Sequence, residues 1–360
     1  MGRKRILGLG TMAALITLLI LPLGPGQGEA GETWSTYKAL APIRHHNLTI
    51  FPVVTDRTHD TKNFLTLDEG LRSGEVMVTE AGTFQPLIRG PRPHPPAGAQ
   101  VNRLVLVNNS EHPLILLAGE ILTGGKQDRV VGKDRIVPPQ SDPIDLAVFC
   151  VEPGRWVATK YDFGSFHSLM AQPSVRRSAM ADKDQRKVWA EVHTVGGALA
   201  AAASPPAALG IESTSSYAGV MSNEEVKQRV EAMAAPLEQS YQGVMRELRE
   251  RNAVGVVVAV NDQIIWADLF ASTPLLEKYW PKLIRSYAAE ALIRPTAPGN
   301  PDVKAAQAFL QDFGARRETV ESEPGVYRRT ELEGEGFTAF ELSSLLPGTG
   351  FDIHIAKMVQ

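Results

Sequence analysis

The sequence predicts a single α+β domain over residues 31–360, with a β-rich first half and helices of the second half packed against a mixed or antiparallel sheet. Two observations carry this prediction. In the first half, short apolar runs of strand length alternate with glycine and proline turns. In the second half, apolar residues recur every three or four positions, which is the spacing of one helical face. The sequence contains no repeat of solenoid length, so a repetitive architecture is excluded.

The first half is predicted to contain several strands and one short helix. Thr66 opens the helix with a capping-box pattern, and the helix is expected to end near Gly74. Two apolar runs at 103–107 and 113–117 flank a polar turn and are predicted to pair as a hairpin. The proline-rich stretch 90–100 is predicted to be a surface loop. The other predicted strands cover residues 48–54, 75–79, 130–131, 136–137 and 144–151.

The second half is predicted to be mainly helical, and a β-rich C-terminal extension follows at 315–360. Ser222 begins a second capping box, and Asn261-Asp262 is a typical turn pair between two apolar runs. The predicted elements in chain order are a helix at 182–203, an exposed loop or linker at 198–210, a helix at 222–248, a hairpin of strands 253–260 and 263–267, and a helix from Thr273.

The first thirty residues have the composition of a targeting segment. Basic residues precede an apolar run that ends at Leu21, and small residues lead to a cleavage position between Ala30 and Gly31. The run is shorter than the ~20 residues that a spanning helix needs. We therefore predict a cleaved signal peptide over 1–30, a secreted or periplasmic protein, and no transmembrane span after cleavage. The alternative is an uncleaved N-terminal membrane anchor.

Charge and cysteine content exclude several classes of protein. A formal net charge of −3 provides no broad basic surface, so no nucleic-acid partner is expected. The only cysteine, Cys150, excludes an internal disulfide and is interpreted as a buried apolar residue. The histidines have no recognisable ligand spacing, so no metal site is predicted, and the sequence identifies no cofactor.

The segment 119–156 combines glycine turns with clustered charged residues, as binding sites often do. Its beginning is similar to a phosphate-binding P-loop, but the lysine is one residue late and Gln127 replaces the magnesium-binding hydroxyl, which argues against that motif. Adjacent glycines beside cations could still hold an anion, whereas the alternative is a tight turn with solvated charges. The candidate ligand-binding residues are Lys126, Gln127, Arg129, Arg155 and Trp156.

Two glutamates of this segment, Glu120 and Glu152, are the candidate catalytic residues. If their strands are neighbours, the two carboxyl groups could perform acid/base chemistry on a bound substrate. Alternatively, each glutamate pairs with Arg129 or Arg155 in a structural ion pair. The enzyme hypothesis therefore requires both glutamates to converge on one pocket.

The same segment carries a resemblance to a known family. The matching residues are Gly119-Glu120, Gly125-Lys126-Gln127-x-Arg129 and Cys150-Val151-Glu152-x-Gly154-Arg155-Trp156, with later matches at 255–260, at Asp268-x-Phe270 and from Lys282 to Ala291. Over about residues 40–292 the chain resembles the ARG-and-rhodanese-phosphatase-superfamily-associated domain, a prokaryotic family of unknown function. That name implies a genomic association with ADP-ribosylglycohydrolases and phosphatases, and hence a link to NAD or ADP-ribose metabolism.

These observations support three functional hypotheses. The first is an exported binding module that holds a small anionic or nucleotide-like ligand with the segment 119–156. The second is a hydrolytic enzyme that acts on a nucleotide, an ADP-ribose-like compound or another phosphate-containing substrate. The third is a scaffold of the cell envelope for protein partners that the sequence does not identify.

Overall fold

The computed structural model describes residues 36–81, 100–156, 162–247, 251–297, 299, 301–312 and 314–360. The predicted signal peptide and all but the last residue of the predicted loop 90–100 lie outside the described residues. The described elements form a single-domain α+β fold in which strands dominate the first half, so the predicted fold class is confirmed. In this part of the chain, no helix has both the length and the apolar character needed to cross a membrane.

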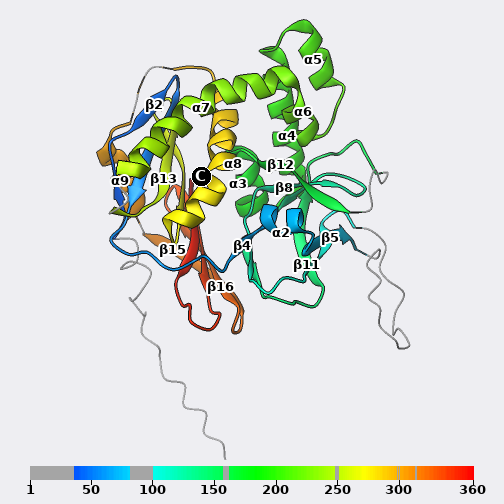
Figure 1. Ribbon diagram of the computed structural model, residues 1–360. Coiled ribbons are helices and arrows are strands. Elements are labelled where there is room, and N and C mark those ends of the chain that lie inside the picture. Colours follow the sequence, from blue (N-terminus) through cyan, green and yellow to red (C-terminus); the bar gives the residue numbers. More distant parts are fainter. Residues whose placement is uncertain are drawn as a thin grey trace, which may run out of the picture.

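A large antiparallel sheet combines strands from both ends of the described chain (Figure 1). Its order is β1-β3-β13-β14-β18-β17-β16-β15, with β2 beside β3. The strands are β1 (Lys38–Ala39), β2 (Ile43–His45), β3 (Leu48–Val54), β13 (Ala253–Val260), β14 (Gln263–Phe270), β15 (Ala315–Glu323), β16 (Tyr327–Gly334), β17 (Phe337–Ser344) and β18 (Asp352–Val359). The predicted hairpin of β13 and β14 is confirmed, with Asn261 in the turn at a φ of 56°.

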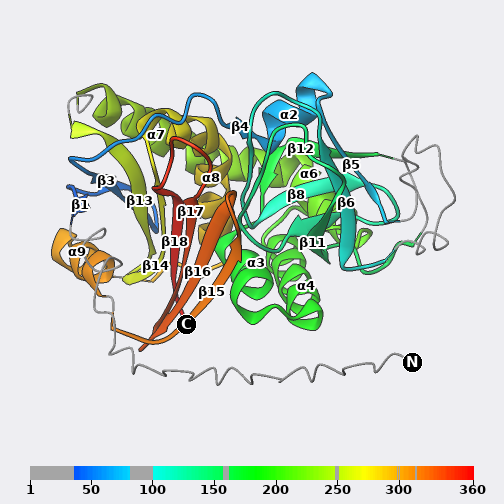
Figure 2. The same cartoon turned by 90° about the horizontal axis from the view of Figure 1, so that it is seen from below.

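A smaller sheet forms from the middle of the chain and rolls up on itself (Figure 2). Its order is β12-β8-β9-β11-β6-β5, and an isolated bridge between Thr79 and Asp162 brings its two edges together. Alternate side chains point inwards and form an apolar core that includes the fully buried Leu106, Leu122 and Val131. We call this the rolled sheet. Its strands are β5 (Val76–Glu80), β6 (Arg103–Asn108), β8 (Glu120–Gly124), β9 (Arg129–Val131), β11 (Ile144–Cys150) and β12 (Phe163–Met170).

A three-stranded sheet, β10-β7-β4, contradicts one prediction. Its strands are β4 (Leu65–Thr66), β7 (Leu114–Leu116) and β10 (Arg135–Val137). The predicted hairpin of 103–107 with 113–117 is wrong, because β6 pairs with β5 and β11 while β7 pairs with β10 and β4. The side-chain amide of Asn108 donates to the backbone oxygens of His112 and Pro138 and so holds the turn. The turn thus passes the chain from one sheet to another.

Helix α8 lies between the two larger sheets (Figure 1). It contacts β12 of the rolled sheet and β13 of the large sheet, and it packs along α7. Because of this position, even Lys282 and Glu290 of α8 are buried. The helical elements are α2 (Leu67–Ser73), α3 (Pro173–Arg177), the π-helix η1 (Ser178–Asp182), α4 (Gln185–Ala201), α5 (Pro205–Glu212), α6 (Tyr217–Ser222), α7 (Glu224–Glu247), α8 (Thr273–Leu292) and α9 (Val303–Gln311).

One predicted helix boundary is confirmed and one predicted loop is wrong. Thr66 caps α2 through Glu69, and Gly74 ends the helix with a φ of 76°. The linker predicted at 198–210 is instead helical, since α4 continues to Ala201 and α5 begins at Pro205. Proline in the first helical turn is favourable because the backbone N–H that it lacks would have no partner there. The alanine-rich and proline-rich composition therefore produces a second helix.

Candidate functional site

Two turns of the predicted site segment lie side by side. Arg155 donates from Nη1 to the backbone oxygen of Gly125 at 2.9 Å and from Nε and Nη2 to the two carboxylate oxygens of Glu152 at 2.8 and 2.6 Å. Glu152 also accepts from the backbone N–H of Asp128 at 2.9 Å. Gly125 has a φ of 48°, and a Cβ there would lie 2.2 Å from the ring of Phe163. The glycine turn after β8 is therefore packed tightly and tied to the turn after β11.

Asp128 connects these turns to the helical layer. Its Oδ1 accepts from the backbone N–H of Gly124 at 3.1 Å, and its Oδ2 accepts from the hydroxyl of Ser216, the N-cap of α6, at 2.7 Å. Burial raises the pKa of the Asp128 carboxyl, and the hydrogen bond from Ser216 opposes this rise. Glu152 thus takes the ion-pair alternative with Arg155, and Arg155 acts as a clamp between the two turns.

Arg129, the first residue of β9, is fully buried and has unused donors. Its Nη1 donates to the backbone oxygen of Gln127 at 2.7 Å. Its Nε and Nη2 have no hydrogen-bond partner among the described residues, and Oε1 of Glu80 lies 4.0 Å from Nη2. Buried charged groups normally have their hydrogen bonds satisfied, because leaving them unsatisfied is costly. The Arg129 guanidinium therefore has the capacity to bind an additional acceptor.

Trp156 lies over both Lys126 and Arg129. The centroid of its ring is 5.0 Å from Nζ of Lys126 and 5.9 Å from Cζ of Arg129, within the range of cation–π contacts. The backbone N–H of Lys126 donates to Glu80 at 2.7 Å, while its ammonium forms no ion pair with a described residue. Trp156 is 42% exposed. We call Lys126, Arg129 and Trp156 the cation–tryptophan cluster. Its two cations can bind an oxyanion of a ligand, and its indole can stack on a planar group of the same ligand.

Glu120 belongs to a different part of the molecule. Its Oε1 accepts from Nζ of Lys282 at 2.5 Å, and the same ammonium donates to Oδ2 of Asp68 at 2.7 Å. Its Oε2 accepts from the backbone N–H of Leu117 at 2.8 Å. Burial raises the pKa of Glu120, and Lys282 opposes this rise. Glu120 and Glu152 share no hydrogen-bond partner among the described residues: Glu120 pairs with Lys282, whereas Glu152 pairs with Arg155.

A buried network around Asp268 joins two strands of the large sheet to α3 and α8, and the sequence did not predict it. Arg176 of α3 donates from Nη1 and Nη2 to the two carboxylate oxygens of Asp268 in β14 at 2.8 and 3.0 Å. His354 of β18 contacts Asp268 through Nε2 at 3.1 Å and Asp134 through Nδ1 at 2.6 Å. The hydroxyl of Tyr287 in α8 also bonds to Asp268. We call these residues the Asp268 network, and all are at most 1% exposed.

His354 makes the stability of the protein depend on pH. Burial lowers the pKa of His354, but Asp134 and Asp268 outweigh burial and raise it from 6.5 to about 9. The stabilisation from the protonated imidazole is therefore complete below the unfolded value of about 6.5 and is lost as the pH rises through about 9. We expect the stability advantage of the wild type over His354→Gln, measured by urea unfolding, to shrink between about pH 6.5 and pH 10.

The comparison with His354→Gln is needed because Lys357 acts in the opposite direction. Burial lowers the pKa of Lys357 to about 8, so its neutralisation favours the folded state as the pH rises. Lys357 is present in both proteins, and its contribution cancels in the difference. An advantage of the wild type that stays constant over this pH range would show that His354 is not charged in the folded state.

The described residues contain no group of three or more histidine, cysteine, aspartate or glutamate side chains that could hold a metal ion. Cys150 is buried, and burial raises the pKa of its thiol, so the interpretation of Cys150 as a buried residue is confirmed.

The fold and these sites define an α+β protein in which buried polar networks tie α3 to the large sheet and α8 to the rolled sheet, and two clustered cations lie beside the rolled sheet. The chain belongs to the ARG and Rhodanese-Phosphatase-superfamily-associated Protein domain family, whose family model matches residues 36–357. The resemblance seen in the sequence is thus confirmed, and the match continues past residue 292 into the C-terminal strands. No curated protein and no solved structure matches the chain.

Proposed function

We propose that the chain is an exported binding module for a small anionic or nucleotide-like ligand, held at the cation–tryptophan cluster. The observation that carries this proposal is the fully buried guanidinium of Arg129, whose Nε and Nη2 lack hydrogen-bond partners among the described residues. A carboxylate or phosphate oxygen is the acceptor that best matches two such donors, because hydrogen bonds between charged groups are stronger than neutral ones.

The neighbouring residues favour a ligand with both an anionic group and a planar group. Lys126 adds a second positive charge, and the exposed indole of Trp156 offers a stacking surface beside both cations. The adjoining glycine turn is held in place by Arg155 and Asp128, so the site is organised before a ligand arrives. A nucleotide combines the two required features in one molecule, whereas inorganic phosphate has only the first.

We expect ligands of this class to stabilise the protein in a thermal-shift screen of inorganic phosphate, ADP, NAD and ADP-ribose. A ligand present at 100 times its dissociation constant adds about 2.7 kcal/mol to the free energy of unfolding. Lys126→Ala and Trp156→Ala should each weaken binding by roughly tenfold or more, because each removes one charged or stacking contact. Arg129→Gln should remove most of the affinity.

Three controls make this test specific. Lys62→Ala removes an exposed lysine elsewhere, and Leu209→Ala removes a large apolar side chain that is 70% exposed, so neither should alter binding. The ligand should also change tryptophan fluorescence in the wild type and not in Trp156→Phe. If no compound of the screen stabilises the wild type, or if Lys126→Ala and Trp156→Ala bind as tightly as it does, the proposal is wrong.

A further inference from the structure

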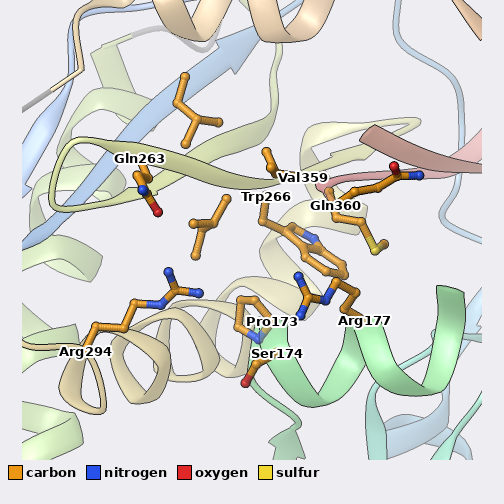
Figure 3. A pocket seen from close by; sticks show the side chains of 11 residues that line it. Pro173, Ser174, Arg177, Gln263, Trp266, Arg294, Val359 and Gln360 are labelled. Carbon is orange, nitrogen blue, oxygen red and sulfur yellow. The ribbon is translucent and has the colours of Figure 1, made fainter. Parts of the chain in front are cut away.

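A cleft with a volume of about 490 Å³ lies between α3, the start of β14, the end of β18 and the residue Arg294, which follows α8 closely (Figure 3). This volume is within the range of sites for small organic ligands. We call it the Arg177 cleft. Its polar lining includes Ser174, Arg177, Gln263, Arg294 and Gln360. Figure 3 shows the guanidinium groups of Arg177 and Arg294 approaching the cleft from different sides.

The two arginines have donors that the described residues leave unused. The side chain of Arg177 is half-buried and forms no hydrogen bond or ion pair with a described residue, although its charge interacts with Glu191 at longer range. Arg294 donates from Nε and Nη2 to Oε1 of Glu290 at 3.0 and 2.7 Å, whereas its Nη1 has no described partner. A single ligand oxyanion could therefore accept from both side chains without breaking an existing ion pair.

Trp266 supplies an independent sign of a ligand. Its side chain lines the cleft and is 1% exposed, yet the indole Nε1 has no hydrogen-bond acceptor among the described residues. The guanidinium of Arg176 lies 4.4 Å from the centroid of the Trp266 ring and so helps to fix the indole in place. A buried indole N–H usually has a partner, so an acceptor atom of a ligand would complete this site.

The rest of the lining limits the ligand further. Pro173, Ile264, Ile265 and Val359 give the cleft an apolar wall. A neighbouring hollow of about 660 Å³ shares Arg177 and contains Asp182, Glu191, Glu331 and Glu333. These carboxylates repel any negative charge that extends from the cleft towards this hollow, and Glu191 already interacts with the charge of Arg177. The cleft therefore favours one anionic group, attached to a body that can contact apolar side chains.

We propose that the Arg177 cleft is a second binding site, for a small molecule with one carboxylate or phosphate-ester group on a short aliphatic body. The anionic group binds between Arg177 and Arg294, and one of its oxygens or a neighbouring acceptor receives the N–H of Trp266. The aliphatic body packs against Ile264, Ile265 and Val359. This site shares no residue with the cation–tryptophan cluster and does not depend on the function proposed for that cluster.

The indole N–H signal of Trp266 tests the proposal directly. The five tryptophans can be labelled with ¹⁵N, and the protein can be titrated with pentanoate, butyl phosphate, inorganic phosphate and butan-1-ol. We expect pentanoate or butyl phosphate to move the Trp266 signal, and the stronger of the two identifies the source of the anionic group. Titration to about 10 mM detects ligands with millimolar dissociation constants, which correspond to weak binding. The signal of Trp266 is the one that disappears in Trp266→Phe. If that variant does not fold, replacing each of the other four tryptophans in turn assigns their signals and leaves the signal of Trp266.

Matched variants separate the cleft from the rest of the surface. Arg177→Gln should weaken the effect about tenfold or more, because it removes charged hydrogen bonds. Two variants of exposed side chains, Arg186→Gln on α4 and Lys62→Ala, should leave the effect unchanged. No movement of the Trp266 signal with either anion would overturn the proposal, and so would an equal response in Arg177→Gln. A response to butan-1-ol as strong as to pentanoate would show that the site does not require an anionic group. Equal binding of inorganic phosphate and butyl phosphate would show that it does not require an aliphatic body.

Discussion

Replacing Asp268 with alanine is expected to lower the free energy of unfolding by about 3–5 kcal/mol, the usual result of removing one partner from a buried ion pair. Burial opposes ionisation of this carboxyl, but Arg176 and His354 outweigh burial and hold the pKa of Asp268 well below its usual range. Asp268→Ala leaves the Arg176 guanidinium buried without its bidentate partner and leaves His354 with Asp134 alone. Two strands of the large sheet, β14 and β18, meet α3 and α8 at this residue, so the loss should affect the packing of these helices on the sheet.

The control for Asp268→Ala is Asp145→Ala. Asp145 pairs with Arg103 at 2.6 Å, but the two side chains are 58% and 44% exposed. A pair exposed to this extent contributes at most about 1 kcal/mol. Urea unfolding of both variants at neutral pH measures how much each substitution lowers the free energy of unfolding. Equal losses would show that the Asp268 network stabilises the fold no more than an exposed ion pair does. Asp268→Asn keeps one acceptor oxygen and should cost less than the alanine variant.

The elements that could be predicted from the sequence are those specified by neighbouring residues. The α2 helix follows from its capping box and from Gly74, and the β13–β14 hairpin follows from the turn at Asn261 between two apolar runs. The hairpin expected across 103–117 is wrong for the complementary reason. A polar turn shows where a strand ends, but the choice of the next strand's partner depends on segments far away in the chain, here β10 and β4.

In the candidate site, too, contacts between segments close in the sequence could be predicted, whereas contacts between distant segments could not. The turns at Gly125 and after Glu152 lie side by side as the clustered motif suggested, since both belong to neighbouring parts of the rolled sheet. The environment of Glu120 could not be derived from its neighbours, because its partner Lys282 is 162 residues away. Arg176, Asp268 and His354 were also missed as a group. The sequence does show each of these three as a polar side chain within an apolar strand or helix. This pattern does not show which of them contact each other in the folded protein.

Lys282→Met is expected to cost about 3–5 kcal/mol at neutral pH, similar to the loss for Asp268→Ala. Lys282 donates to both Glu120 and Asp68, and all three side chains are buried. Methionine keeps the length of the side chain but removes the ammonium, so two carboxylates remain close together without a cation. Burial already raises the pKa of Glu120, and loss of Lys282 removes the main group that opposes this rise.

The penalty of Lys282→Met should therefore depend on pH. A carboxyl with a raised folded pKa favours the folded state at low pH, and this contribution is lost as the pH rises through the folded value. The stability difference between wild type and Lys282→Met should thus be smaller near about pH 4.5 than at pH 7. Lys278→Met is the matched control one helical turn earlier. Lys278 and its partner Glu69 are 29% and 33% exposed, so that variant should cost at most about 1 kcal/mol.

Adding Glu120→Gln to Lys282→Met decides between a structural and a catalytic interpretation of Glu120. Glutamine removes one of the two uncompensated charges and can still accept the backbone N–H of Leu117. The double variant should therefore be more stable than Lys282→Met alone at pH 7, and its stability should depend less on pH. A double variant that is no more stable would mean that Glu120 is not held charged by Lys282. Recovery would instead identify Glu120 as the anionic half of a buried pair between α8 and the rolled sheet, which explains its burial without acid/base chemistry.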